Sequence, residues 1–142
     1  MRRSFILFLF LPLLVISCTE IKNVDIFVDF PAVVQEDDEF EVIAKLVNTG
    51  KSSKELYSID ISDKYLKGIT VLKIDPDYKE STHIPIDNSQ SYTFNHSLLP
   101  GDTAVFKISC KAIYIGDFNG DFDFCIDSEF NFISKNVRTV VK

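Results

Sequence analysis

The sequence predicts an all-β protein, an antiparallel β-sandwich of about seven to eight short strands. Three observations lead to this fold class. From residue 24 onward, apolar and polar residues alternate in short runs, the pattern of half-buried strands. Turn residues separate these runs roughly every 8 to 15 residues. The chain also has 13 Phe, 5 Tyr and no Trp, and aromatic and β-branched residues favour strands over helices.

Four strands are predicted in the first half of the chain. In the first three runs apolar residues occupy every second position, so one face of the strand is buried, whereas the facing of the fourth run is ambiguous. The first strand ends at Pro31, and the fourth is interrupted at Gly68. The runs and their inward residues are 24–30 (Val24, Ile26, Val28, Phe30), 39–47 (Phe40, Val42, Ala44, Leu46), 57–61 (Tyr57, Ile59, Ile61) and 65–74.

The second half begins with residues 75–88, a polar segment with two prolines that is predicted to be the longest loop. Loops of this length are uncommon unless they are functional, so this one is the first candidate for a contact surface. Phe118-Asn119-Gly120 predicts a hairpin turn. The strands and their inward residues are 91–96 (Tyr92, Phe94, His96), 104–114 (Ala104, Phe106, Ile108, Cys110, Ala112, Tyr114), 122–126 (Phe122, Phe124, Ile126) and 133–141 (Val137, Thr139, Val141).

Two stretches carry a resemblance to a known class of domain. Residues 39–47 run into Asn48-Thr49-Gly50, and residues 98–112 contain the lead-in Pro100-Gly101-Asp102-Thr103. Both stretches resemble bacterial immunoglobulin-like modules of cell-surface and adhesion-related proteins. The resemblance implies that residues 24–142 form a single immunoglobulin-like sandwich, which is a statement about fold and not about activity.

The first 18 residues resemble the signal of a bacterial lipoprotein. Arg2 and Arg3 precede an apolar run over residues 5–16, and a small residue, Ser17, follows it. This order is typical of a secretory signal peptide. The run is too short for a transmembrane helix, which needs about 20 apolar residues. Residues 15–18, Val15-Ile16-Ser17-Cys18, resemble the lipobox whose cysteine is lipidated.

The lipobox resemblance implies a location. Residues 1–17 would be the signal peptide, cleaved between Ser17 and Cys18, and residues 18–23 would be the lipidated cysteine and a short tether. A diacylglycerol thioether and an N-acyl group such as palmitate on Cys18 would give stable membrane anchoring, because two chains are needed. Thr19, in place of Asp, favours the outer membrane if the cell has one. The alternative is an ordinary secretory signal that contains a cysteine.

The net charge of −6, which becomes −8 without Arg2 and Arg3, excludes one class of partner. Phosphates reward lysine and arginine, so an acidic chain is poorly suited to nucleic acids or anionic lipid surfaces. The charge instead favours solubility.

Cys110 and Cys125 are the two thiols of the predicted domain, and an exported location permits a disulfide between them. Their positions in the strands argue against it, because Cys110 shares the inward face with Phe106 whereas Cys125 has the opposite parity to Phe124. A disulfide would need a β-bulge. Without one, Cys110 is a small buried apolar residue.

A weak calcium pattern lies around the predicted hairpin turn. Four residues place side-chain oxygens at alternate positions, as at the start of an EF-hand loop. The pattern then fails, because Phe122 stands where the loop needs Gly and Ser128 where it needs Glu. No metal or other cofactor is therefore predicted; the weak candidates are Asp117, Asn119, Asp121 and Asp123, with Asp127 or Glu129.

No catalytic pattern is recognised. Neither His83 nor His96 has a partner at metal-ligand spacing, no serine lies in a nucleophile elbow, and no phosphate-binding loop is present. The sequence therefore predicts a non-enzymatic, membrane-anchored lipoprotein of a bacterial cell envelope that binds an envelope protein or a glycan. The alternatives are a calcium-stabilised adhesion domain and a hydrolase whose residues are not recognised.

Overall fold

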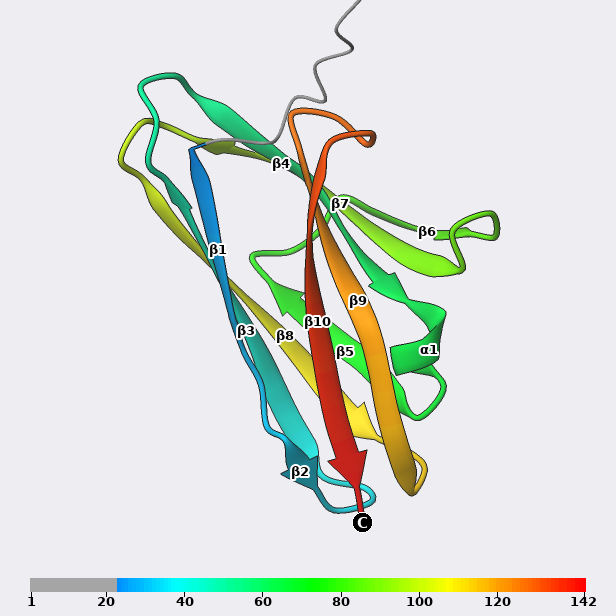
Figure 1. Cartoon of the computed structure of the whole chain (residues 1–142). Helices are drawn as coiled ribbons and strands as arrows, with labels where there is room; N and C mark the ends of the chain where they lie inside the picture. Colours follow the sequence, from blue (N-terminus) through cyan, green and yellow to red (C-terminus); the bar gives the residue numbers. More distant parts are fainter. Residues whose placement is uncertain (1–22) are drawn as a thin grey trace, which may run out of the picture.

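The computed structural model describes residues 23–142 (Figure 1). They form two packed sheets and one short helix, α1 (Asp63–Leu66). The four-stranded sheet has the order β1 (Val24–Asp29), β3 (Glu39–Asn48), β8 (Thr103–Ala112) and β5 (Ile69–Asp75). The six-stranded sheet has the order β2 (Val33–Val34), β10 (Phe132–Val141), β9 (Gly116–Ile126), β4 (Lys54–Ser62), β7 (Ser89–Leu98) and β6 (Glu80–Ile84). The predicted all-β sandwich is confirmed.

The chain passes repeatedly between the two sheets. β1 pairs antiparallel with β3, and after Pro31 the chain joins the other sheet, where β2 pairs with β10 in the one parallel pairing of the described residues. β8 and β9, although consecutive, also belong to different sheets. The start of β1 and the C-terminus lie at opposite ends of the sandwich (Figure 1).

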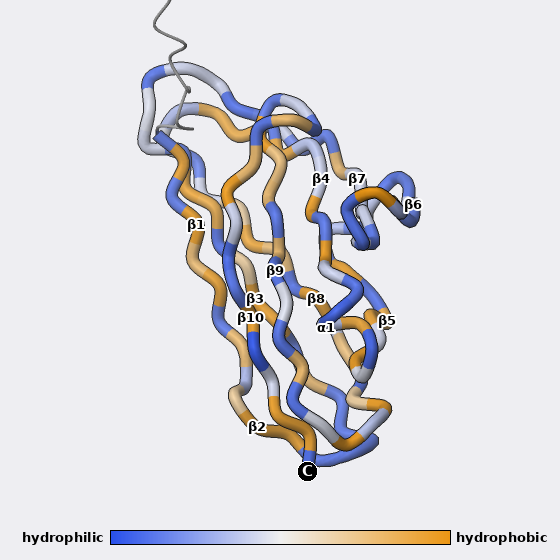
Figure 2. Tube along the Cα trace, turned by 45° about the vertical axis from the view of Figure 1, so that its right-hand side comes forward, coloured by the Kyte–Doolittle hydropathy of each residue, from blue (hydrophilic) through white to orange (hydrophobic). Residues whose placement is uncertain are grey.

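Alternation of burial along the strands builds the core. In β3 the predicted inward residues Val42, Ala44 and Leu46 are fully buried, and in β8 Phe106 and Ile108 are as well. Figure 2 shows the corresponding change between hydrophobic and hydrophilic segments along these strands. The predicted alternation in these strands is therefore confirmed, because one face of each is removed from water.

The fourth predicted strand is shorter than expected. The residues around Tyr65 form α1, and β5 begins only at Ile69. Ser62 caps the helix, since its hydroxyl accepts a hydrogen bond from the backbone N–H of Lys64 at 3.3 Å. Tyr65 is fully buried and its hydroxyl lies 3.0 Å from that of Thr139. The segment is therefore helical instead of extended, and the buried contact between Tyr65 and Thr139 holds it against β10.

The predicted loop over residues 75–88 is a β-hairpin arm. β6 pairs antiparallel with β7, and residues 85–88 form the turn between them. The first four residues of β6 are exposed and the last, Ile84, is half-buried, so the strand carries no alternation that a sequence pattern could reveal. With β6 and the two-residue β2, the sandwich has ten strands instead of the predicted seven to eight.

The predicted hairpin turn at Phe118-Asn119-Gly120 is wrong, because these residues lie inside β9. The chain crosses between the sheets earlier, and Tyr114, predicted to point inward, is exposed in that crossing. Gly120 has a different role. A Cβ atom there would lie 3.0 Å from Ser62 Cβ and from the backbone nitrogen of Tyr65, so glycine lets α1 pack on β9.

Tyr57 was also predicted to face inward, and this prediction is wrong because β4 contains a β-bulge. The pairing register shifts between Leu56 and Ser58, which buries Leu56 completely and leaves Tyr57 half-buried. Ile59 and Ile61 are fully buried as predicted. The bulge changes which residues face inward by one position.

The predicted signal peptide, the cleavage site between Ser17 and Cys18 and most of the tether lie outside the described residues. Within residues 23–142, no helix has the length and apolar character needed to cross a membrane.

Candidate functional site

An acidic pocket on the outer face of the six-stranded sheet is the candidate site. Its volume is about 220 Å³. β4, β9 and the first residues of β7 and β10 contribute to it, together with the β6–β7 turn and the loop between β9 and β10. The residues that line it are Asp60, Asp87, Ser89, Asp123, Cys125, Glu129 and Phe132.

Two of the aspartates that line the pocket lie directly opposite each other. Asp60 on β4 and Asp123 on β9 are cross-strand partners, so both carboxylates project from the same face. Asp60 accepts hydrogen bonds from the Ser91 hydroxyl at 2.5 Å and from the Cys125 thiol at 3.5 Å. In contrast, Oδ1 of Asp123 is buried without a hydrogen-bond partner in the structure.

The surroundings of Asp123 disfavour its ionised form. Burial is the main reason that the pKa of the Asp123 carboxyl is raised, and the carboxylates of Asp121, Asp60 and Asp87 raise the pKa further. Ser134, the neighbour of Asp123 on β10, acts in the opposite direction and lowers this pKa. No lysine or arginine lines the pocket. The pocket is therefore suited to a group that brings positive charge or hydrogen-bond donors.

Replacing Asp123 with asparagine should stabilise the fold at neutral pH. Because the pKa of this carboxyl is raised in the folded state, its destabilising effect is absent below the pKa of the unfolded chain. The effect grows as the pH rises through the two pKa values. Asp123→Asn should therefore raise the free energy of unfolding at pH 7 by a few tenths of a kcal/mol to about 1 kcal/mol.

Urea unfolding of Asp123→Asn and of the wild type at pH 3.5 and pH 7 measures this effect. The gain over the wild type should be larger at pH 7 than at pH 3.5. Asp25→Asn, an exposed change on the other sheet, serves as the control and should show a smaller difference. An equal gain at both pH values would contradict the prediction.

The two cysteines of the described chain are unpaired, buried and on different faces. Cys110 belongs to the core between the sheets, whereas Cys125 lies on the pocket side of β9. Burial raises the pKa of both thiols to about 12. Neither is a thiolate at neutral pH, so neither is suited to act as a nucleophile.

The four weak calcium candidates do not form a loop. All four lie on the extended strand β9, where alternate residues are about 7 Å apart, so their side chains cannot converge on one ion. Asp117 instead forms a bidentate ion pair with Arg138 at 2.6 and 2.9 Å, which lowers the pKa of its carboxyl. Within residues 23–142, no group of three His, Cys, Asp or Glu side chains could hold a metal. Among these residues, the calcium alternative therefore has no cluster of side chains that would support it.

A second hollow, of about 430 Å³, lies beside α1 and the β6–β7 turn. It brings together the acidic Asp63, Asp87 and Asp121 with the basic Lys64 and Lys67. His83 on β6 contacts Asp63 at 2.9 Å and ties the hairpin arm to the helix. Residues 75–88, predicted to be a contact surface, thus line both hollows through Asp87.

The sequence analysis did not identify Asp60 as a site residue, because its position opposite Asp123 depends on the register of β4 against β9.

Comparisons with known proteins show the fold and no family. No family model matches the chain, and no curated protein matches its sequence. Among solved structures, the native alpha-2-macroglobulin of E. coli is similar over 84% of this chain and 7% of its own, with a TM-score of 0.55 and 13% identity. A mutant alpha-2-macroglobulin of Salmonella is similar over the same shares, with a TM-score of 0.53 and 11% identity.

A third similar structure is AvmM, described as catalysing macrocyclization in alchivemycin A biosynthesis. The match covers 83% of this chain and 89% of that chain, with a TM-score of 0.53 and 8% identity. This chain therefore has an immunoglobulin-like fold, and it spans about 7% of the length of the macroglobulins. Similarity at this level carries no activity from one protein to another.

Proposed function

We propose that this protein is a lipid-anchored, non-enzymatic binding module of a bacterial cell envelope, whose partner is an envelope protein or a glycan. The fold supports a binding role, since immunoglobulin-like sandwiches present rigid surfaces and end loops to partners. The resemblance of residues 1–18 to a lipoprotein signal supports the location.

The acidic pocket carries the proposal. It is an open, preformed hollow with an unpaired carboxylate oxygen on Asp123, and the thiol beside it is protonated at neutral pH. This arrangement suits recognition by charge and hydrogen bonding better than nucleophilic chemistry. A partner that offers an amine, a guanidinium or several hydroxyl groups would complement it.

Cys18→Ala tests the anchor. The wild type should appear in the membrane fraction, and mass spectrometry should find two or more acyl chains on Cys18. The variant cannot be lipidated and should be released from the membrane fraction almost completely, because the lipid provides the attachment. A variant that stays with the membrane to the same extent would refute the lipoprotein assignment.

Cross-linking in cells tests the binding role. Envelope proteins and glycans that co-purify with the wild type should be depleted with Cys18→Ala, which removes the location. They should also be depleted with the double variant Asp60→Asn and Asp123→Asn, which keeps the location and neutralises the pocket. Asp117→Asn, on the same strand but paired with Arg138, is the matched control. Equal capture by all of these proteins would refute the proposal.

A further inference from the structure

We propose that the end of the sandwich at which β1 begins rests on the membrane that carries the anchor, with the side chains of Leu99 and Phe130 inserted among the lipids. This inference rests on the proposed function, because it requires the lipid on Cys18. It adds an orientation and a second, protein-based contact with the bilayer. We call this region the anchor end; it comprises Asn23, the β3–β4 loop (49–53), the β7–β8 turn (99–102) and the β9–β10 loop (127–131).

Hydrogen bonds hold the parts of the anchor end together. The carbonyl of Asn23 accepts a hydrogen bond from Thr49 N–H at 2.9 Å, so the start of β1 is fixed to the β3–β4 loop. Gly101 N–H donates to the carbonyl of Asn48 at 2.9 Å, which adds the β7–β8 turn. Figure 1 shows these loops together at the end opposite the C-terminus.

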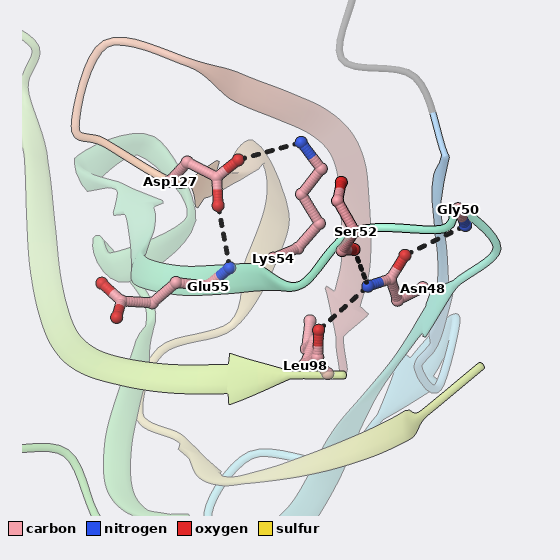
Figure 3. A network of polar contacts seen from close by, with 7 residues as sticks. All are labelled: Asn48, Gly50, Ser52, Lys54, Glu55, Leu98 and Asp127. Carbon is pink, nitrogen blue, oxygen red and sulfur yellow. Dashed lines mark hydrogen bonds and ion pairs between the residues drawn. The ribbon is translucent and has the colours of Figure 1, made fainter. Parts of the chain in front are cut away.

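The β9–β10 loop joins the same end through Asp127. Its carboxylate accepts hydrogen bonds from Lys54 Nζ at 3.0 Å and from Glu55 N–H at 2.9 Å (Figure 3). The carboxylate thus fixes the loop that carries Phe130 to the first residues of β4. The anchor end is one connected platform and not a set of independent loops.

Asn48 makes this platform rigid from inside. Its side chain is fully buried, and Nδ2 donates to the carbonyls of Ser52 and Leu98, both at 2.9 Å. Its Oδ1 accepts from Gly50 N–H at 3.0 Å (Figure 3). One side chain therefore satisfies two backbone groups of the β3–β4 loop and one at the end of β7, and this region needs little reordering when it meets a surface.

Two large apolar side chains project from the platform. Leu99 is 56% exposed and Phe130 is 82% exposed. Their backbone N–H groups are already bonded, to Asp102 Oδ2 at 3.1 Å and to the Ser128 hydroxyl at 3.3 Å. Insertion of these tips would therefore bury apolar area without leaving these two backbone groups unpaired. The anchor end carries charge of both signs, since Lys51, Asp102 and Glu129 are all exposed, so the proposed contact with lipid depends on the two apolar side chains.

The length of the tether selects this end. Residues 18–22 can span at most about 17 Å, so the bilayer surface lies within that distance of Asn23. The exposed apolar residues of the opposite end, Tyr114 and Ile115, lie beyond strands of about ten residues, which measure about 33 Å. When the anchor end faces the bilayer, Tyr114 and Ile115 therefore cannot reach it. The acidic outer face of the six-stranded sheet is also a poor surface for lipid phosphates.

The sequence contains no tryptophan, so the tryptophan fluorescence of a variant with one introduced tryptophan comes from that position alone. Full-length, lipidated protein carrying Leu99→Trp or Phe130→Trp would be reconstituted into phosphatidylcholine vesicles that contain lipids brominated on the acyl chain. Ile115→Trp, 67% exposed at the far end, is the matched control. Phe27→Trp, 59% exposed on the outer face of the four-stranded sheet, reports a domain that lies on its side.

Tryptophan at positions 99 and 130 should shift its emission to the blue and be quenched at least about twofold more than at position 115, because interfacial side chains lie about 5–10 Å deep. Equal quenching at positions 130 and 115, or stronger quenching at position 27 than at 130, would overturn the inference. Vesicle flotation and the mass of the acylated N-terminus test the anchor separately. Protein that floats without this pattern refutes only the orientation, whereas unlipidated protein that does not float refutes the proposed function as well.

Discussion

Phe106→Ala is expected to lower the free energy of unfolding by about 4 kcal/mol. Phe106 is fully buried on β8 and faces the other sheet. Its ring makes T-shaped contacts with two aromatic rings on β7, that of Phe94 at a centroid distance of 5.0 Å and that of His96 at 5.3 Å. Truncation removes apolar burial, breaks both aromatic contacts and leaves a cavity between the sheets.

Urea unfolding followed by far-ultraviolet circular dichroism measures this effect. Val105→Ala is the control, because Val105 is the adjacent residue of β8 but lies on the outer face and is 44% exposed. It should change the free energy of unfolding by less than about 0.5 kcal/mol. A loss of less than about 1 kcal/mol for Phe106→Ala would mean that this ring does not join the two sheets.

Asn48→Ala is expected to lower the free energy of unfolding by about 3 kcal/mol. The substitution removes three hydrogen bonds of 2.9 to 3.0 Å at a fully buried position. The partner groups are backbone carbonyls and an N–H, and each buried group left unpaired costs about 1–3 kcal/mol. We expect less than the full sum, because the loops of the anchor end can admit water once they loosen.

Asn136→Ala provides the matched control for Asn48→Ala. Asn136 is exposed and its amide donates to Asp121 at 2.9 Å on the surface, so its loss should cost less than about 1 kcal/mol. Hydrogen exchange should also quicken at Gly50 and Gly101 in Asn48→Ala and not in Asn136→Ala. Equal stability of the two variants would show that Asn48 does not organise the anchor end.

The sequence predicts β3 and β8 well because burial on one face dominates in both strands. In each, apolar residues at every second position face the other sheet, and this local pattern is readable without knowledge of the partner strand. The same reasoning fails for β6, where the first four side chains are exposed. An exposed edge strand is held by backbone hydrogen bonds to its neighbour, so its sequence shows no alternation of apolar and polar residues.

Gly120 shows a second limit. An Asn-Gly pair between apolar residues is a good signal for a hairpin, yet here it lies in the middle of β9. The glycine is required because Tyr65 and α1 approach the strand from a distant part of the chain. A contact of this kind cannot be derived from the residues on either side of the glycine.

The candidate site also depends on contacts between distant parts of the chain. Asp123 was visible as one of four alternating polar residues, but its opposition to Asp60 depends on the register of β4 against β9. A bulge between Leu56 and Ser58 lies in that strand and shifts the register by one residue. The acidic pocket therefore could not be predicted, although each of its carboxylates could be read from the sequence.

By itself, the sequence determined that this chain is all-β, which residues of its regular strands face inward, and that Cys110 and Cys125 occupy opposite faces. These are properties of period-two burial, which acts over a few neighbouring residues. Only the tertiary structure decided the sheet order, the place of α1, the pocket around Asp60 and Asp123, and the loops that gather at the anchor end. Each of these depends on pairing between segments far apart in the chain, where register and backbone approach decide which side chains meet.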